Sequence, residues 1–150
     1  LKFQGYSDSI KEDMPKGVRP TFTLAMPSEF IKQCEQADVI YFHGGDDNLL
    51  QYWMRQFDMP SLFDNKVIAT NSAGSNMIST HYWTCDWRQC NDGFGILPIK
   101  FVPHYESSFG ANDPRGPIDW NNAMHELSQY GDMSLPIYAL KEGEYTIFEV

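Results

Sequence analysis

The stretch Lys66-Val-Ile-Ala-Thr-Asn-Ser-Ala-Gly-Ser-Asn-Met77 predicts a strand, a sharp turn and the start of a helix. A β-branched run over residues 67–70 precedes Ser72, and two small residues follow it. This is the layout of a nucleophile elbow, in which a serine is held at the tip of a tight turn. The helix N-terminus behind Ser72 also favours negative charge beside it. Thr70 stands where such elbows usually carry glycine, so a close-packed crossover without catalysis also fits these residues.

A glycine pair follows an earlier apolar run. Residues 39–42 predict a strand, Gly44 and Gly45 come directly after it, and a helix begins near Asp47. Such a turn exposes backbone N–H groups where an oxyanion or a phosphate would be stabilised. An ordinary turn between a strand and a helix, with Asp46 or Asp47 as the N-cap, is the alternative.

A histidine follows a third apolar run. Residues 99–102 predict a strand, and Pro103 fixes the approach of the chain to His104. Ligands of open α/β sheets bind at the carboxyl edge of the strands, so we expect glycine amides, a serine and a histidine at one edge. A serine hydroxyl needs a base within hydrogen-bond reach, and His104 is the best candidate. The other histidines lie beside the glycine turn or in expected helices: His43, His81 and His125.

These motifs, in this order, resemble the dipeptidase E and cyanophycinase family of serine peptidases. The resemblance rests on the glycine turn at 44–45, the Ser-Ala-Gly elbow at 72–74, and the Gly-Ile-Leu-Pro and Pro-His-Tyr steps within 95–105. It covers residues 28–150 and extends to a closing segment at 135–148, where the family has two strands around a Glu-Gly turn.

The resemblance implies an α/β fold of the class I glutamine amidotransferase-like type, a three-layer sandwich around a mainly parallel sheet. Alternating strand and helix patterns agree with such a sheet. The departures are His43 and Asp46, where the family tends to have glycine and asparagine. The family also carries two strands before the position of Ser28, and a sheet without its central strand forgoes burial worth ~25 cal/mol per Å². We therefore expect this chain to be a fragment that lacks these N-terminal strands.

The resemblance also implies catalytic roles for three side chains. Ser72 matches the nucleophile, and His104 matches the base 32 residues further on. A carboxylate normally holds such a base in the correct tautomer. In the family an acidic residue stands a little over a dozen positions after the serine, and Asp86 is the nearest match at 14 positions. Asp92 is the other acid between the serine and the histidine, and Glu106 is a further alternative.

Backbone amides and an arginine are expected to hold the substrate. The N–H groups of Gly45 and Ala73 would form the oxyanion hole, with Gly44 beside the substrate. The family favours aspartyl peptides, and a substrate carboxylate that meets a chain of net charge −9 needs a local cation. Arg115 matches an arginine of the peptidase pattern and can pair a carboxylate through two N–H groups, while Arg88 is the alternative.

We therefore predict a serine hydrolase that cleaves a peptide or amide bond of small aspartyl-type peptides through Ser72, His104 and Asp86. The predicted mechanism requires no metal and no organic cofactor, and the predicted partner is a small peptide substrate. An amidotransferase-like domain that has lost catalysis and serves as a binding or assembly module is the alternative. A lipase-type α/β hydrolase is disfavoured because the Gly-x-Ser-x-Gly pattern is missing.

The composition is that of an ordinary globular domain. The 150 residues are 42% hydrophobic and 21% charged, which suits one domain over 1–150 with a buried core. A net charge of −9 and a pI near 4.7 argue against nucleic-acid and anionic-membrane partners. No apolar run approaches the ~20 residues of a membrane span. The three cysteines form neither a disulfide nor a zinc pattern, which favours a reducing, cytoplasmic compartment; a homodimer stays open.

Periodicity and breakers predict the order of elements. Residues 1–27 and 81–95 are expected to be irregular, and Ser28 is expected to cap the first helix. Apolar residues at helical spacing within 49–57 are expected in the core. The predicted helices cover residues 28–36, 47–57, the segment from the elbow to about 80, and 117–130, and the predicted strands cover 39–42, 67–70, 99–102, 137–140 and 145–148.

Overall fold

The computed structural model describes residues 2–149 and divides into two compact units. Unit 1 comprises Leu1–Asp38, and unit 2 comprises Val39–Val150. Among the described residues, every strand and every residue expected in the active site lies in unit 2. The chain is an α/β protein, as predicted, and one unit carries the whole candidate site.

Unit 1 contains two helices, α1 (Lys2–Asp13) and α2 (Phe30–Gln36). The prediction that residues 1–27 are irregular is wrong, because the helix-breaking prolines come only after α1. The predicted Ser28 cap is also wrong. Glu29 occupies the N-cap position of α2 and makes no side-chain hydrogen bond there.

The first sheet of unit 2 consists of two parallel strands, β1 (Val39–Phe42) and β2 (Val67–Thr70). The strands pair in register from end to end, so their carboxyl ends meet. Helices α3 (Asp47–Met54) and α4 (Met59–Leu62) lie between them in the chain. The glycine turn and the turn of Ser72 therefore leave the same edge of this sheet.

The second sheet has the order β4-β3-β5-β6 and is mixed. Its middle strands pair parallel, β3 (Ser79–Thr84) with β5 (Leu97–Val102), and β5 also pairs parallel with β6 (Ile137–Ala139). The edge strand β4 (Gln89–Asp92) runs antiparallel to β3. The carboxyl ends of β5 and β6 consequently lie side by side.

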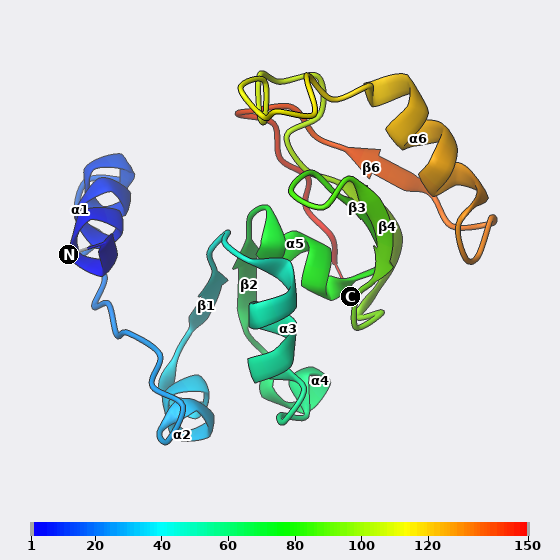
Figure 1. Ribbon diagram of the computed structural model, residues 1–150. Helices are drawn as coiled ribbons and strands as arrows, with labels where there is room; N and C mark the ends of the chain where they lie inside the picture. The colour runs from blue at the N-terminus through cyan, green and yellow to red at the C-terminus, as the bar shows by residue number, and fades with distance from the viewer. Residues whose placement is uncertain (1, 150) are drawn as a thin grey trace. The chain divides into compact units, whose positions relative to one another are not determined.

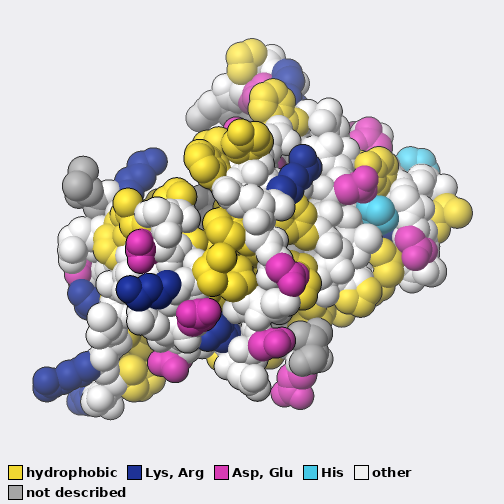
Figure 2. Space-filling model, turned by 90° about the horizontal axis from the view of Figure 1, so that it is seen from below, with side chains coloured by type: hydrophobic (Ala, Val, Ile, Leu, Met, Phe, Trp, Pro, Cys, Tyr) yellow, Lys and Arg dark blue, Asp and Glu magenta, His cyan; other side chains and the backbone are white. Residues whose placement is uncertain are grey.

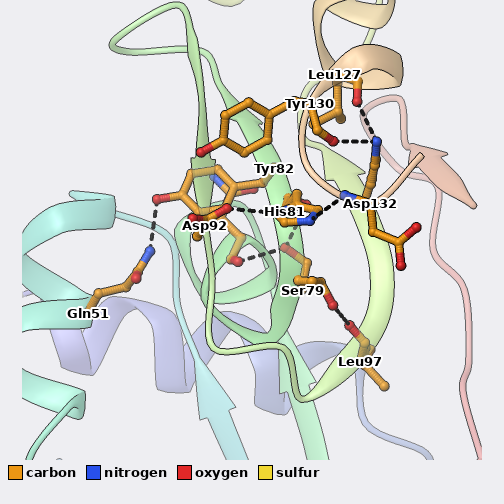
Figure 3. A network of polar contacts seen from close by, with 12 residues as sticks. Gln51, Ser79, His81, Tyr82, Asp92, Leu97, Leu127, Tyr130 and Asp132 are labelled. Carbon is orange, nitrogen blue, oxygen red and sulfur yellow. Dashed lines mark hydrogen bonds and ion pairs between the residues drawn. The ribbon is translucent and has the colours of Figure 1, made fainter. Parts of the chain in front are cut away.

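Strand β3 presents alternate side chains to two helical layers, drawn on either side of it in Figure 1. Trp83 lies on the side of α6 (Trp120–Gln129) and belongs to a buried apolar cluster. Tyr82 lies on the opposite side, where its hydroxyl accepts a hydrogen bond from Gln51 Nε2 at 2.8 Å (Figure 3). The members of the apolar cluster are Trp83, Cys85, Val102, Ile118, Ala123 and Leu127.

Helix α3 turns a polar face inward. Its buried residues are Asp47, Gln51 and Met54, whereas Leu49 and Trp53 are 57% and 47% exposed. The prediction that the apolar residues of this helix form core is therefore wrong for two of them. The physical reason is that β3 presents hydroxyl groups to the helix, and buried polar groups need hydrogen-bonding partners.

Three more expectations about secondary structure are corrected. Residues 81–95 are not irregular, because β3 and β4 form a hairpin there. Helix α6 begins later than the predicted Pro117, since Asp119 is its N-cap and accepts a hydrogen bond from the N–H of Asn122 at 3.0 Å. Residues 145–148 do not pair as a strand.

Hydrophobic side chains reach the surface between charged ones on the face drawn in Figure 2. Apolar atoms contribute a large share of the accessible surface of an ordinary folded protein. Among residues 2–149, none of the helices has the length and apolar character that a membrane span requires. The most exposed large hydrophobic residues of unit 2 include Tyr52, Met133, Tyr145 and Ile147.

Lys100 on β5 carries a charge into the core, where it is only 1% exposed. Its Nζ donates to the carbonyl oxygens of Leu127 at 2.8 Å, Ser128 at 3.3 Å and Tyr130 at 2.6 Å. The last carbonyl groups of a helix have no partner within the helix, and a cation is favoured beside them. Lys100 therefore caps the C-terminus of α6 and attaches this helix to the second sheet.

We expect Lys100→Met to lower the free energy of unfolding of unit 2 by about 2–3 kcal/mol, because three carbonyl groups lose a charged donor. Lys141→Met is the matched control. That side chain is 52% exposed and pairs with Glu106, and solvent screening leaves such exposed pairs with little effect on stability. Urea denaturation followed by tryptophan fluorescence measures both variants, and equal losses would contradict this role of Lys100.

Candidate active site

Ser72 lies at the tip of a strained turn between β2 and α5 (Ala73–Ile78). Its φ of 45° and ψ of −114° lie outside the regions that non-glycine residues prefer. The turn packs closely on the end of β1, because a Cβ on Gly74 would lie 2.3 Å from the carbonyl oxygen of Phe42. The N–H of Asn71 donates to the same oxygen at 3.1 Å. The strained elbow expected at Ser72 is thus present.

The glycine pair packs against this elbow. A Cβ on Gly44 would lie 3.0 Å from the Cβ of Ser72, so a larger residue would push on the serine. The N–H of Gly44 is engaged within the protein, since it donates to Oδ1 of Asn71. Gly45 is exposed, and Asp46 after it caps α3 by accepting a backbone hydrogen bond at 2.8 Å. Gly44 therefore permits close approach, and Gly45 is the better placed donor toward a ligand.

His104 brings its ring to the hydroxyl of Ser72. Its Nε2 lies 3.0 Å from the Oγ of Ser72. His104 comes two residues after the end of β5, behind Pro103, and has a φ of 56°, a left-handed conformation that is uncommon for a residue other than glycine. Phe109 stacks on the imidazole with ring centroids 4.4 Å apart and an interplanar angle of 11°. These contacts hold the plane of the imidazole toward the serine.

The carboxylate at Nδ1 of His104 belongs to Glu142 and not to Asp86. Asp86 lies exposed in the turn between β3 and β4, where its carbonyl oxygen accepts a hydrogen bond from Arg115 at 2.8 Å. The expected pairing of Asp86 with His104 is therefore corrected to Glu142. The physical reason is the parallel pairing of β5 and β6, which brings the residues after both strands to the same edge of the sheet.

Backbone contacts fix Glu142 beside the histidine. The N–H of Leu140 donates to the carbonyl of Val102 at 3.1 Å, and the N–H of Tyr105 donates to the carbonyl of Leu140 at 2.9 Å. An ion pair between Lys141 and Glu106 joins the same two segments. The signal in the sequence that could have identified Glu142 is the Glu-Gly turn one residue beyond the predicted strand 137–140.

The two arginines considered for substrate binding are held in loops. Arg115 donates through Nε and Nη2 to both carboxylate oxygens of Asp113, at 2.8 and 2.7 Å, and these hydrogen bonds lower the pKa of Asp113. Arg88 donates to the carbonyl of Gly116. Among the hydrogen bonds of residues 2–149, neither arginine reaches the serine or histidine described above.

The other histidines have separate contacts. His81 lies in β3 rather than in a helix, and its Nδ1 lies 2.7 Å from Oδ1 of Asp92, the alternative acid (Figure 3). Its Nε2 accepts a hydrogen bond from the N–H of Asp132 at 3.1 Å. His43 places Nδ1 3.0 Å from the carbonyl of the next residue, and His125 is exposed on α6.

A shallow hollow of about 280 Å³ adjoins the glycine turn. Gly44, which packs against Ser72, forms part of its lining, and residues of α3 form another part. Within residues 2–149, no group of three or more His, Cys, Asp or Glu side chains is arranged to hold a metal ion. The residues that line the hollow are His43, Gly44, Gly45, Asp46, Leu49, Leu50 and Trp53.

An α/β fold, a strained serine at a strand–helix turn and a histidine within hydrogen-bond distance of it are features that serine hydrolases share. The family model for Peptidase family S51 matches residues 20–149. The chain therefore belongs to peptidase family S51, which confirms the resemblance to dipeptidase E and cyanophycinase. No curated protein and no solved structure matches the chain.

We expect Glu142→Gln to slow covalent labelling of Ser72 by a fluorophosphonate by about 10²–10⁴-fold, because an amide no longer favours the tautomer of His104 that accepts the serine proton. Asp86→Asn should leave the labelling rate unchanged, since Glu142 occupies Nδ1. Stopped-time labelling followed by intact mass spectrometry measures both rates. A slow Asp86→Asn variant beside a normal Glu142→Gln variant would reverse the assignment.

Proposed function

We propose that this chain is a serine hydrolase that cleaves a peptide or amide bond through Ser72, His104 and Glu142. One observation carries the proposal: Oγ of Ser72 lies 3.0 Å from Nε2 of His104, whose Nδ1 contacts Glu142. A nucleophile, a base and an orienting carboxylate in this order are the parts of a serine triad. The mechanism thus uses glutamate where the sequence predicted aspartate.

In the first half of the proposed reaction, Oγ of Ser72 attacks the carbonyl carbon of the scissile bond while Nε2 of His104 takes its proton. Nε2 must be unprotonated to do so, which places the ring proton on Nδ1, where it is donated to Glu142. The carboxylate then stabilises the imidazolium that forms. His104 returns the proton to the leaving amine, the C–N bond breaks, and the acyl group stays on Ser72.

The oxyanion of the tetrahedral intermediate would be held by two backbone N–H groups. Ala73 directly follows the nucleophile and is 2% exposed, and Gly45 lies on the turn that packs against Ser72. Loss of one such donor typically costs about 2.7–4 kcal/mol of transition-state stabilisation. Water then attacks the acyl carbon while Nε2 of His104 takes its proton, the ester C–Oγ bond breaks, and His104 returns the proton to Oγ of Ser72 as the product acid leaves.

We further propose that the substrate is a small aspartyl-type peptide, as the family resemblance implies. Arg115 is the proposed cation for its carboxylate, since the side chain is 48% exposed and presents a bidentate fork. The fork already holds the carboxylate of Asp113, so a substrate carboxylate would have to exchange with it. The hollow beside Gly45 would take the remainder of the peptide.

The finer architecture is also part of the proposal. Family membership supports a class I glutamine amidotransferase-like arrangement, in which helices cover both faces of a mainly parallel sheet. The helices on both sides of β3 and the parallel pairs of β5 agree with it.

Ser72→Ala should abolish turnover and fluorophosphonate labelling, because it removes the attacking oxygen. The variant keeps a small residue at an incompletely buried position, so its circular dichroism spectrum should be unchanged. Release of free amino acids from peptides, followed by liquid chromatography and mass spectrometry, measures turnover. A Ser72→Ala protein that cleaves at the normal rate would refute the nucleophile, and a wild-type chain inert to probe and peptides would favour the non-catalytic binding or assembly module.

Arg115→Gln tests the substrate class. We expect it to raise KM for aspartyl dipeptides about tenfold or more, because a charge-assisted pair is lost, and to leave KM for the matching asparaginyl dipeptides unchanged. Arg55→Gln at the exposed end of α3 is the control. Equal effects on both peptide series would remove Arg115 from carboxylate recognition.

A further inference from the structure

Asp47 is a buried carboxylate that the proposed mechanism does not use. It is 4% exposed, and both of its oxygens are hydrogen-bonded. Oδ1 accepts from Nδ2 of Asn76 at 2.8 Å, and Oδ2 accepts from Oγ1 of Thr84 at 2.6 Å. Burial raises the pKa of Asp47, and the two donors oppose that shift. Burying a charged group costs free energy. A carboxylate at this position therefore points to a role that an apolar side chain could not fill.

The bond of Asp47 to Asn76 joins the two segments that carry the proposed oxyanion donors, Gly45 and Ala73. Asp47 is the first residue of α3 and follows Gly45 by two positions. Asn76 lies on α5, and its own N–H donates to the carbonyl of Ser72 at 2.9 Å. Asp47 therefore links the turn that carries Gly45 to α5, the helix whose N-cap residue is Ser72.

The amide of Asn76 depends on this contact. Its side chain is 2% exposed, and its Oδ1 is buried without a hydrogen-bond partner in the described structure. The carboxylate of Asp47 is thus the contact that orients the amide. Thr84 at the end of β3 is the second hydrogen-bond donor to Asp47. The start of α3 is therefore attached both to α5, through Asn76, and to β3, through Thr84.

We propose that Asp47 is a positioning residue that holds the Gly45 turn against the Ser72 elbow, so that the N–H groups of Gly45 and Ala73 keep the spacing an oxyanion requires. The inference rests on the proposed function. Oxyanion donors act within about 2.7–3.1 Å of the developing charge, and loss of one costs about 10²–10³ in kcat. A small displacement of α3 along its axis therefore lowers kcat without removing any group that binds the substrate.

A second contact of α3 separates this role from general packing. Gln51, one turn further along the helix, donates to the hydroxyl of Tyr82 at 2.8 Å (Figure 3). Both Asp47 and Gln51 are 4% exposed and attach the same helix to β3. Asp47 alone of the two also bonds to α5, the helix of the nucleophile.

The experiment compares Asp47→Asn with Gln51→Met in the full chain. We expect both variants to be less stable in urea, and only Asp47→Asn to lower kcat, by about 10- to 100-fold, with KM for the same peptide unchanged. Asp58→Asn, the same substitution at an exposed position, is the control for the chemical change. The rates of the wild type and of Ser72→Ala are compared first. If they do not differ, the proposed function fails, and this outcome is distinct from a failure of the role of Asp47.

Thr84 provides a second test if Asp47→Asn does not fold. Thr84→Val removes the hydroxyl at nearly constant volume and should lower kcat, whereas Thr84→Ser keeps the hydroxyl and should restore it. The double variant Asp47→Asn/Thr84→Val should lose no more kcat than Asp47→Asn alone, because both act through one bond. A normal kcat for Asp47→Asn, equal kcat losses for Asp47→Asn and Gln51→Met, or equal rates for Thr84→Val and Thr84→Ser would overturn the proposal.

Discussion

Close packing of the Ser72 turn on the carboxyl end of β1 is the constraint on which the rest of the site depends. The serine can adopt its φ of 45° only if the chain beside it comes very close to the strand, and a Cβ on Gly74 would lie 2.3 Å from the carbonyl oxygen of Phe42. Gly44 meets the same turn from the other side. The backbone strain is thus offset by close contacts that only glycine permits.

The second sheet contributes the proton-transfer half of the site. Parallel strands end at the same edge, so the pairing of β5 with β6 brings Glu142 to the ring of His104. The stacked Phe109 and the ion pair of Lys141 with Glu106 support the same corner. The serine therefore comes from the first sheet and the histidine from the second, and Oγ of Ser72 lies 3.0 Å from Nε2 of His104.

Some elements of the fold could not be predicted from local patterns. The stripe of apolar residues on α3 suggested a core face, but hydroxyl groups on β3 bury Asp47 and Gln51 there instead and leave Trp53 half-exposed. The segment 81–95 looked irregular, yet its residues pair as β3 and β4. In both cases the deciding partner is distant in the sequence, and a periodicity read along one segment contains no information about that partner.

The sequence by itself determined the strand–turn–helix at Ser72, the glycine turn, and the histidine after a strand, since these depend on residues adjacent in the chain. Their order also identified the family to which the chain belongs. Only the tertiary structure decided which carboxylate contacts His104, because Asp86 is nearer in the sequence but Glu142 is nearer in space. The pairing of β5 with β6 depends on long-range packing. It brings Glu142 into contact with His104 although the two residues are 38 positions apart in the sequence.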